Sequence, residues 1–148
     1  PFGEDDLVGH ARLAERLVTP VCLDEPIVSI DTTRTAVALG ACDVVNLKPG
    51  RVGGYLEARR IHDWCVQQSI PLWCGGMLET GLGRAANVAL AAMSGFTLPG
   101  DLSASARFYG TDIVTEPIVV EHGSIAVPSG VGFGVDLDPD VIARFRVD

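Results

Sequence analysis

One lysine and one aspartate lie at the ends of two short apolar segments, where their side chains could act together on a bound molecule. Lys48 is the only lysine among the 148 residues. A lysine amine can exchange protons with a substrate when partial burial or a nearby cation lowers its pKa toward neutrality. Arg51 is one candidate for that cation, and a bound metal ion is another. We therefore interpret Lys48 as an acid/base group rather than a solvated surface lysine.

Two carboxylates precede this lysine. Asp24 and Glu25 close the apolar segment before it, and Asp24 lies 24 residues ahead of Lys48. Oxygen ligands at a strand end can bind a hard divalent cation, although the same residues are also common as helix caps or in solvated turns. A single Asp-Glu pair offers too few ligands for a magnesium site. Asp101 could approach the same axis and add one more.

A glycine-rich segment follows the next apolar run. Gly75 and Gly76 would let backbone N–H groups approach a substrate, and the start of the following helix favours an anion such as a carboxylate. Met77 and Leu78 could line an apolar pocket. The alternative interpretation of this segment is a flexible turn with ordinary packing.

The same segment contains a partial dinucleotide-binding pattern. Gly81-x-Gly83-x-x-Ala86 matches it, and an acidic residue, Asp101, follows 20 residues after Gly81. However, four residues separate Gly76 at the strand end from Gly81, whereas such a turn places its first glycine directly after the strand. A nucleotide-binding domain is therefore the least favoured interpretation.

Alternating strands and helices would position these residues. We expect strands over 21–23, 43–47, 70–74 and 96–98, and helices over 7–17, 32–39, 55–68 and 83–93. Short apolar strands separated by helices indicate an α/β fold with a parallel sheet. The strand ends recur at intervals of 24, 27 and 26 residues, which is the length of one βα unit. Each unit places its polar or glycine residues just after the strand, where the active sites of βα barrels lie.

The pattern changes after Asp101. Residues 113–120 and 124–127 flank a turn at 121–123, which predicts a β-hairpin, and a short helix is expected over 139–145. We therefore expect a βα portion at 1–110 and a separate tail at 111–148. The histidines at 10 and 62 lie on predicted helices and are expected to face solvent.

Charge and cysteine content exclude several classes of protein. The net charge of −8 argues against binding nucleic acid or an anionic membrane surface, both of which require a basic face. Four cysteines without CxxC spacing indicate neither a zinc site nor a disulfide framework, and they favour a reducing, cytoplasmic setting. Cys22 and Cys74 lie in apolar runs and are expected in the core.

Four segments of the sequence resemble one known family. Residues 22–25 (CLDE), 46–54 (NLKPGRVGG), 74–81 (CGGMLETG) and 98–101 (LPGD) are similar to the o-succinylbenzoate synthase and N-acylamino acid racemase family. That family belongs to the muconate-lactonizing subgroup of the enolase superfamily, related to mandelate racemase. The resemblance implies the C-terminal half of a (β/α)₈ barrel, with a tail packing toward a capping domain.

The resemblance also implies an activity, namely abstraction of the α-proton of a small-molecule carboxylate with Mg²⁺ (or Mn²⁺) stabilising the enolate. The enzyme would act as a lyase or an isomerase. Lys48 would be the acid/base lysine and Asp24 a metal ligand, surrounded by Glu25, Asn46 and Arg51. Six further residues would lie near the substrate: Gly75, Gly76, Met77, Leu78, Asp101 and Phe108.

The sequence departs from the family pattern in one respect. The family carries a Lys-x-Lys on strand two, an aspartate on strand three and a glutamate on strand four, and a chain with one lysine cannot supply the first of these. We therefore expect an incomplete metal site and no catalysis by residues 1–148 alone. The alternative is a half-barrel binding or assembly module that associates through its open edges, with itself or with a partner.

Overall fold

The computed structural model describes residues 2–147, which divide into two units. Unit 1 contains Pro1–Gly75 and Ser94–Gly100, and unit 2 contains Gly76–Met93 and Asp101–Asp148. The sequence predicts a βα portion at 1–110 and a tail at 111–148 that packs toward a capping domain. This division stays a prediction.

Unit 1 is built on a parallel sheet, as the alternating pattern predicts. Its strands are β1 (Cys22–Leu23), β2 (Val44–Leu47) and β3 (Leu72–Cys74), in the order β1-β2-β3. The helices α2 (Ile30–Ala38) and α3 (Tyr55–Gln67) connect successive strands, and α1 (Leu7–Ala14) precedes β1. The predicted α/β class with a parallel sheet is confirmed.

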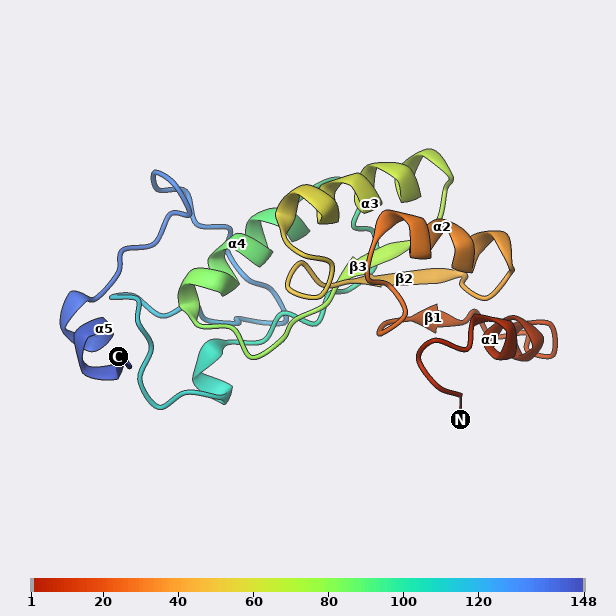
Figure 1. Ribbon diagram of the computed structural model, residues 1–148. Helices are drawn as coiled ribbons and strands as arrows, with labels where there is room; N and C mark the ends of the chain where they lie inside the picture. Colours follow the sequence, from red (N-terminus) through yellow and green to blue (C-terminus); the bar gives the residue numbers. More distant parts are fainter. Residues whose placement is uncertain (1, 148) are drawn as a thin grey trace. The chain divides into compact units, whose positions relative to one another are not determined.

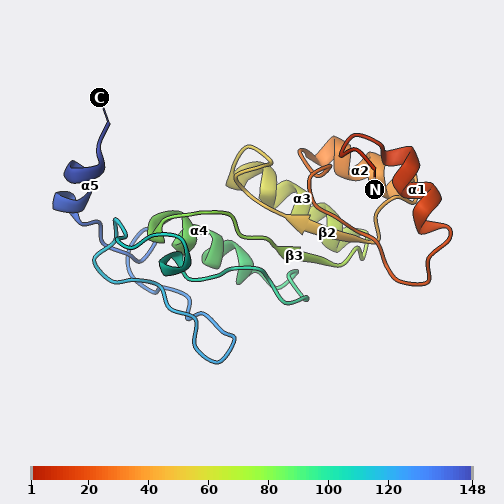
Figure 2. The ribbon, with the colours of Figure 1, turned by 90° about the horizontal axis from the view of Figure 1, so that it is seen from below.

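The two faces of this sheet differ in character. Because side chains alternate along a strand, one face carries five buried residues: Leu23, Val45, Leu47, Leu72 and Cys74. Helices α2 and α3 lie together on one side of the strands (Figure 1). Figure 2 shows the same elements from below. The opposite face carries Cys22, Val44, Asn46 and Trp73, and there the Trp73 indole N–H donates to the Cys22 sulfur at 3.3 Å. Cys22 is exposed, so the expectation that it lies in the core is wrong, whereas Cys74 is buried.

The fourth predicted strand, 96–98, is reduced to one pairing in the structure. Phe96 forms a single parallel bridge with Leu72, and no regular strand forms elsewhere in 94–100. Pro99 has no N–H to donate and restricts the backbone of the residue before it, so it ends the pairing early.

His62 is buried, with 5% of its surface exposed, so the prediction that it faces solvent is wrong. Its ring packs against Phe96 with a centroid separation of 5.0 Å, and Nδ1 contacts the Asp63 carboxylate. The spacing of Ala58, Ile61, His62 and Cys65 places all four on the buried side of α3. This periodicity would have identified His62 as an inward-facing residue.

Unit 2 contains α4 (Gly81–Ala91), a 3₁₀ turn (Ser105–Arg107) and α5 (Pro139–Phe145). The predicted hairpin is present only as its turn. Glu121 and Ser124 exchange both backbone hydrogen bonds at 2.9 Å around His122 and Gly123, whose φ angles are positive. No regular strand flanks this turn within residues 2–147, so the hairpin prediction is wrong. A proline, which cannot donate to a ladder, stands in each flanking segment or next to it: Pro117 and Pro128.

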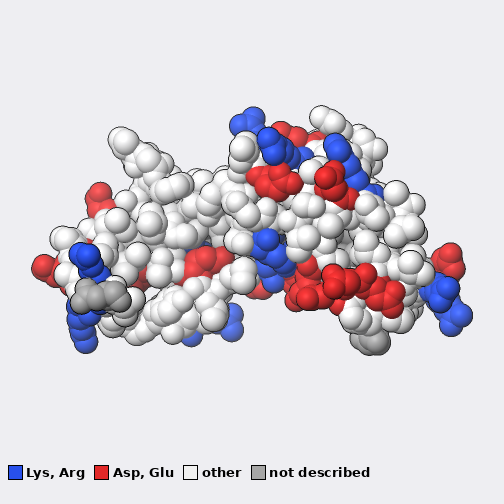
Figure 3. Space-filling model, viewed as in Figure 1, with Lys and Arg blue, Asp and Glu red and all other residues white. Residues whose placement is uncertain are grey.

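Two further sequence expectations concern the surface. The face drawn in Figure 3 has acidic clusters but no continuous basic area among the described residues, as the net charge of −8 predicts. Among residues 2–147, no helix combines the length and the apolar character needed to cross a bilayer.

Candidate functional site

The predicted meeting of the lysine and the aspartate is confirmed. Asp24 follows β1 and Lys48 follows β2, and because these strands are parallel their carboxyl ends share one edge of the sheet. Lys48 Nζ donates to Asp24 Oδ2 at 2.8 Å. The two side chains are 18% and 30% exposed, so the ion pair is partly shielded but still open to a ligand.

Arg51 completes a three-residue ionic cluster. It forms an ion pair with the other carboxylate oxygen of Asp24. Its Nε donates to the Ile27 carbonyl at 2.9 Å, and its Nη2 donates to the Asn46 carbonyl at 2.6 Å. The planar guanidinium therefore joins the loop after β1 to strand β2, and its fixed geometry holds Asp24 beside Lys48.

The charges around Asp24 determine its ionisation. Burial by itself raises the pKa of Asp24, but the hydrogen bonds and charges of Lys48 and Arg51 outweigh burial and hold the pKa below its ordinary value of 3.8. The carboxylate is therefore ionised throughout the neutral range.

This shift predicts how Asp24 affects stability at different pH values. Because the folded-state pKa is depressed, the stabilisation is complete above about pH 4 and is lost as the pH falls through the folded-state value. We expect Asp24→Asn to lower the melting temperature at pH 7, and the difference from wild type to shrink toward pH 2. Thermal unfolding followed by circular dichroism tests this. A difference that stays constant with pH would contradict it.

Gly75 packs directly against the side chains of Lys48 and Asn46. A Cβ at this position would lie 2.2 Å from Asn46 Oδ1 and 2.8 Å from the Lys48 side chain. Asn46 is 2% exposed, and its Oδ1 is buried without a partner in the described structure. The missing side chain of Gly75 thus leaves the space that Lys48 and Asn46 occupy.

Glu25 is exposed beside the cluster. It lines a hollow of about 280 Å³ together with Arg51 and the acidic residues Glu4 and Asp5. This hollow lies wholly within unit 1 and opens next to the arginine that holds Asp24.

The residues present do not fit a complete metal site. Both oxygens of Asp24 already contact cationic side chains. Within residues 2–147, no three His, Cys, Asp or Glu side chains come close enough together to share an ion. Asp24 can supply one oxygen ligand, but a hard divalent cation requires several.

In unit 2, the segment 76–80 leads into α4. Met77 and Leu78 are 50% and 65% exposed, and a Cβ on Gly76 would lie 2.2 Å from the Asp101 carbonyl. The structure thus brings Gly76 beside Asp101, whose side chain, like that of Phe108, is exposed.

The amino end of α4 already carries an anion. Both oxygens of Asp112 accept from the Gly81 N–H, at 2.8 and 2.9 Å. The Gly81 N–H is therefore already bonded within the protein, and Asp112 lies where the positive end of the helix favours an anion.

Sequence reasoning missed a buried ion pair in this unit. Arg84 is fully buried and contacts the Glu79 carboxylate at 2.8 Å. Asn87 also donates to Glu79, at 2.8 Å. The three-residue spacing of Arg84 and Asn87 is a detectable signal, because it places polar groups on one side of an otherwise alanine-rich helix.

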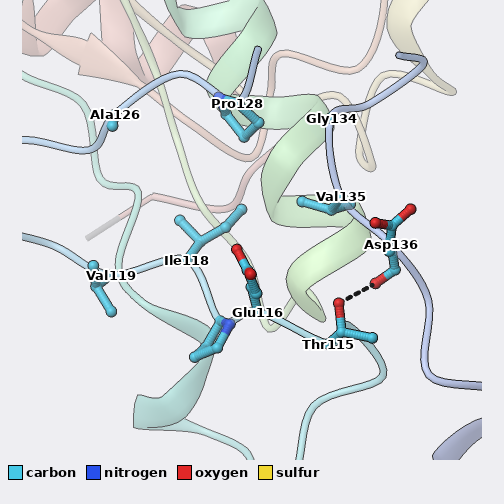
Figure 4. Close-up of a pocket in the computed structure, with 10 residues that line it drawn as sticks. Thr115, Glu116, Ile118, Val119, Ala126, Pro128, Gly134, Val135 and Asp136 are labelled. Atoms are coloured by element: carbon cyan, nitrogen blue, oxygen red, sulfur yellow. Dashed lines mark hydrogen bonds between the residues drawn. The ribbon is translucent and has the colours of Figure 1, made fainter. Parts of the chain in front are cut away.

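A separate hollow of about 320 Å³ lies in the tail of unit 2 (Figure 4). The Thr115 hydroxyl and the Asp136 carbonyl, 3.5 Å apart, bridge one side of it. None of the predicted site residues lines this hollow.

Comparison with known proteins identifies the family. The model of the enolase C-terminal domain-like family matches residues 1–141. An N-succinylamino acid racemase from an Amycolatopsis species is 61% identical over 142 residues, which are 96% of this chain and 38% of the relative. An o-succinylbenzoate synthase from Bacillus subtilis is 48% identical over 98% of this chain and 39% of its own length.

A solved structure agrees with these relatives. An enolase-superfamily member from Listeria innocua superposes with a TM-score of 0.92 at 47% identity, covering 97% of this chain and 39% of that one. The chain therefore spans about two fifths of the length of the relatives it matches. By sequence and by fold, it belongs to the enolase C-terminal domain-like family.

Proposed function

We propose that this chain forms part of an enzyme that removes the α-proton of a small-molecule carboxylate, acting as an o-succinylbenzoate synthase, an N-succinylamino acid racemase, or both. The observation that carries the proposal is the contact between Lys48 and Asp24 at the carboxyl edge of the parallel strands. Relatives that carry these two names align over almost the whole chain.

Lys48 would perform the proton transfer. In its amine form, Nζ takes the proton from the α-carbon, and the electrons of the broken C–H bond pass into the enolate of the carboxylate. In a dehydration, the resulting ammonium returns the proton to a departing hydroxyl group, which leaves as water. A racemisation requires a second acid/base group on the opposite face, and the sequence contains no second lysine.

Asp24 and Arg51 would orient that amine. The Asp24 carboxylate accepts from Lys48 Nζ, while Arg51 holds the carboxylate from its other side. Because the pKa of Asp24 is depressed, the carboxylate stays charged at neutral pH and keeps accepting the hydrogen bond from Lys48 Nζ.

A divalent cation belongs to the proposal for the whole enzyme. We propose Asp24 as one ligand of Mg²⁺ or Mn²⁺, with further ligands that residues 2–147 do not supply. Glu25 and Asn46 would surround this ligand and the lysine. A third group of residues would line the substrate: Gly75, Gly76, Met77, Leu78, Asp101 and Phe108.

A chimeric enzyme tests the proposal. In the Amycolatopsis racemase, the 142 residues that align with this chain are replaced by it. We expect this racemase chimera to exchange the α-proton of an N-succinylamino acid with deuterium in Mg²⁺-containing D₂O, as followed by NMR. We expect the isolated 148-residue chain to show no exchange. A folded chimera without exchange, or turnover by the isolated chain, would contradict the proposal.

A non-catalytic assembly module is the alternative. Within the described residues β1 pairs with β2 alone, so its other edge offers unpaired backbone groups to another strand. A stable homodimer of the 148-residue chain in light scattering, together with an inactive chimera, would favour this alternative.

A further inference from the structure

Side chains of Glu79, Arg84 and Tyr109 hold the main chain of the segment 76–80. The Met77 N–H donates to both oxygens of Glu79 at 2.9 Å, and the Met77 carbonyl accepts from Arg84 Nη2 at 2.9 Å. The Leu78 carbonyl accepts from the Tyr109 hydroxyl. These hydrogen bonds fix the main chain of two successive residues.

The ion pair between Arg84 and Glu79 lies behind these hydrogen bonds, and burial of its charges opposes its contribution to stability. Arg84 is fully buried, and its Nε and Nη1 have no hydrogen-bond partner within the described structure. A buried ion pair loses its hydration, and apolar residues of similar size often stabilise a fold as well or better. Arg84 binds the Met77 carbonyl and the Glu79 carboxylate at the same time. Apolar residues cannot form either interaction.

The side chains of Met77 and Leu78, unlike that of Glu79, are open to a ligand. Met77 and Leu78 are about half and two thirds exposed, although both are apolar. Neighbouring exposed apolar side chains on a fixed backbone are typical of ligand-contacting surfaces.

From this arrangement we infer that Arg84 is a positioning residue, which through Glu79 and Met77 sets the fit of segment 76–80 to the apolar part of the substrate. The inference rests on the proposed function. It assigns the recognition of the substrate's apolar side chain, away from the reacting α-carbon, to a segment whose shape depends on a buried charge pair.

The test compares two variants of the racemase chimera. Arg84→Met alone leaves the Glu79 charge buried without its partner, so the fold loses stability. Glu79→Gln/Arg84→Met removes both charges and regains stability, but the Met77 carbonyl still lacks its donor. For N-succinyl derivatives of amino acids with large apolar side chains, we expect the double variant to show a KM raised about tenfold, with kcat changed less than about threefold.

Hydrogen exchange supplies a readout that does not require activity. Mass spectrometry of a peptide spanning 76–80 should show faster amide exchange in the double variant. The matched control is Asp31→Asn/Arg34→Met, an exposed ion pair on α2, which should leave KM and exchange unchanged. A folded double variant with wild-type KM would overturn the inference. If the parent chimera is inactive, the proposed function fails, and unchanged exchange at 76–80 would then overturn the inference separately.

Discussion

Replacement of Lys48 by methionine is expected to lower the kcat of the racemase chimera by about 10²–10⁴-fold, which is the usual contribution of a positioned acid/base group. Methionine has a similar length but cannot carry a proton. Deuterium incorporation into the enantiomer whose α-proton faces Lys48 should fall in parallel, because this amine removes that proton. Both quantities can be measured by NMR on one sample.

A matched substitution separates chemistry from general damage. Arg59 lies on α3 with 71% of its side chain exposed, so Arg59→Met removes a basic residue far less shielded than Lys48. We expect this control to keep its activity. Full activity in Lys48→Met would show that another group removes the proton.

The second large effect is expected from Gly75→Ala. The added methyl group would overlap Asn46 Oδ1 and press on the Lys48 side chain, while the backbone conformation of Gly75 needs no glycine. The lysine must shift, and a misplacement of about 1 Å can lower a rate by about 10²-fold. We also expect a stability loss of about 1–3 kcal/mol from overpacking. Steady-state kinetics of the chimera and urea unfolding measure the two effects.

Gly110→Ala is the control for this substitution. A Cβ at Gly110 would meet no atom within 4 Å, and the backbone there does not require glycine. This variant should match wild type in both kcat and stability. Equal behaviour of the two alanine variants would mean that Gly75 does not hold the lysine in place.

Strand-end residues were the part of the site that the sequence could predict. Lys48 and Asp24 each follow a short apolar run, and parallel strands bring such positions to one edge whatever the details of the loops. The same rule located Gly75. It could not reveal that Asp24 pairs with Arg51 as well, because that contact depends on the course of the turn after β2.

Partners from distant positions escaped prediction. Asp112 caps α4 from 31 residues away, and no local pattern specifies such a contact. Arg84 was expected on a helix but not inside the unit, since an arginine is usually exposed. The prediction of a strand at 113–120 was wrong for a local reason. The apolar character of this segment favours a strand, but Pro117 prevents a regular ladder.

The distance along the chain between Gly81 and Asp112 has a consequence for biosynthesis. A ribosome completes α4 well before it reaches residue 112, so the nascent helix first emerges without the carboxylate that later caps it. The Thr80 side chain makes no capping hydrogen bond that could act as a substitute. We therefore expect the amino end of α4 to fray until the following segment has folded back and Asp112 accepts from the Gly81 N–H.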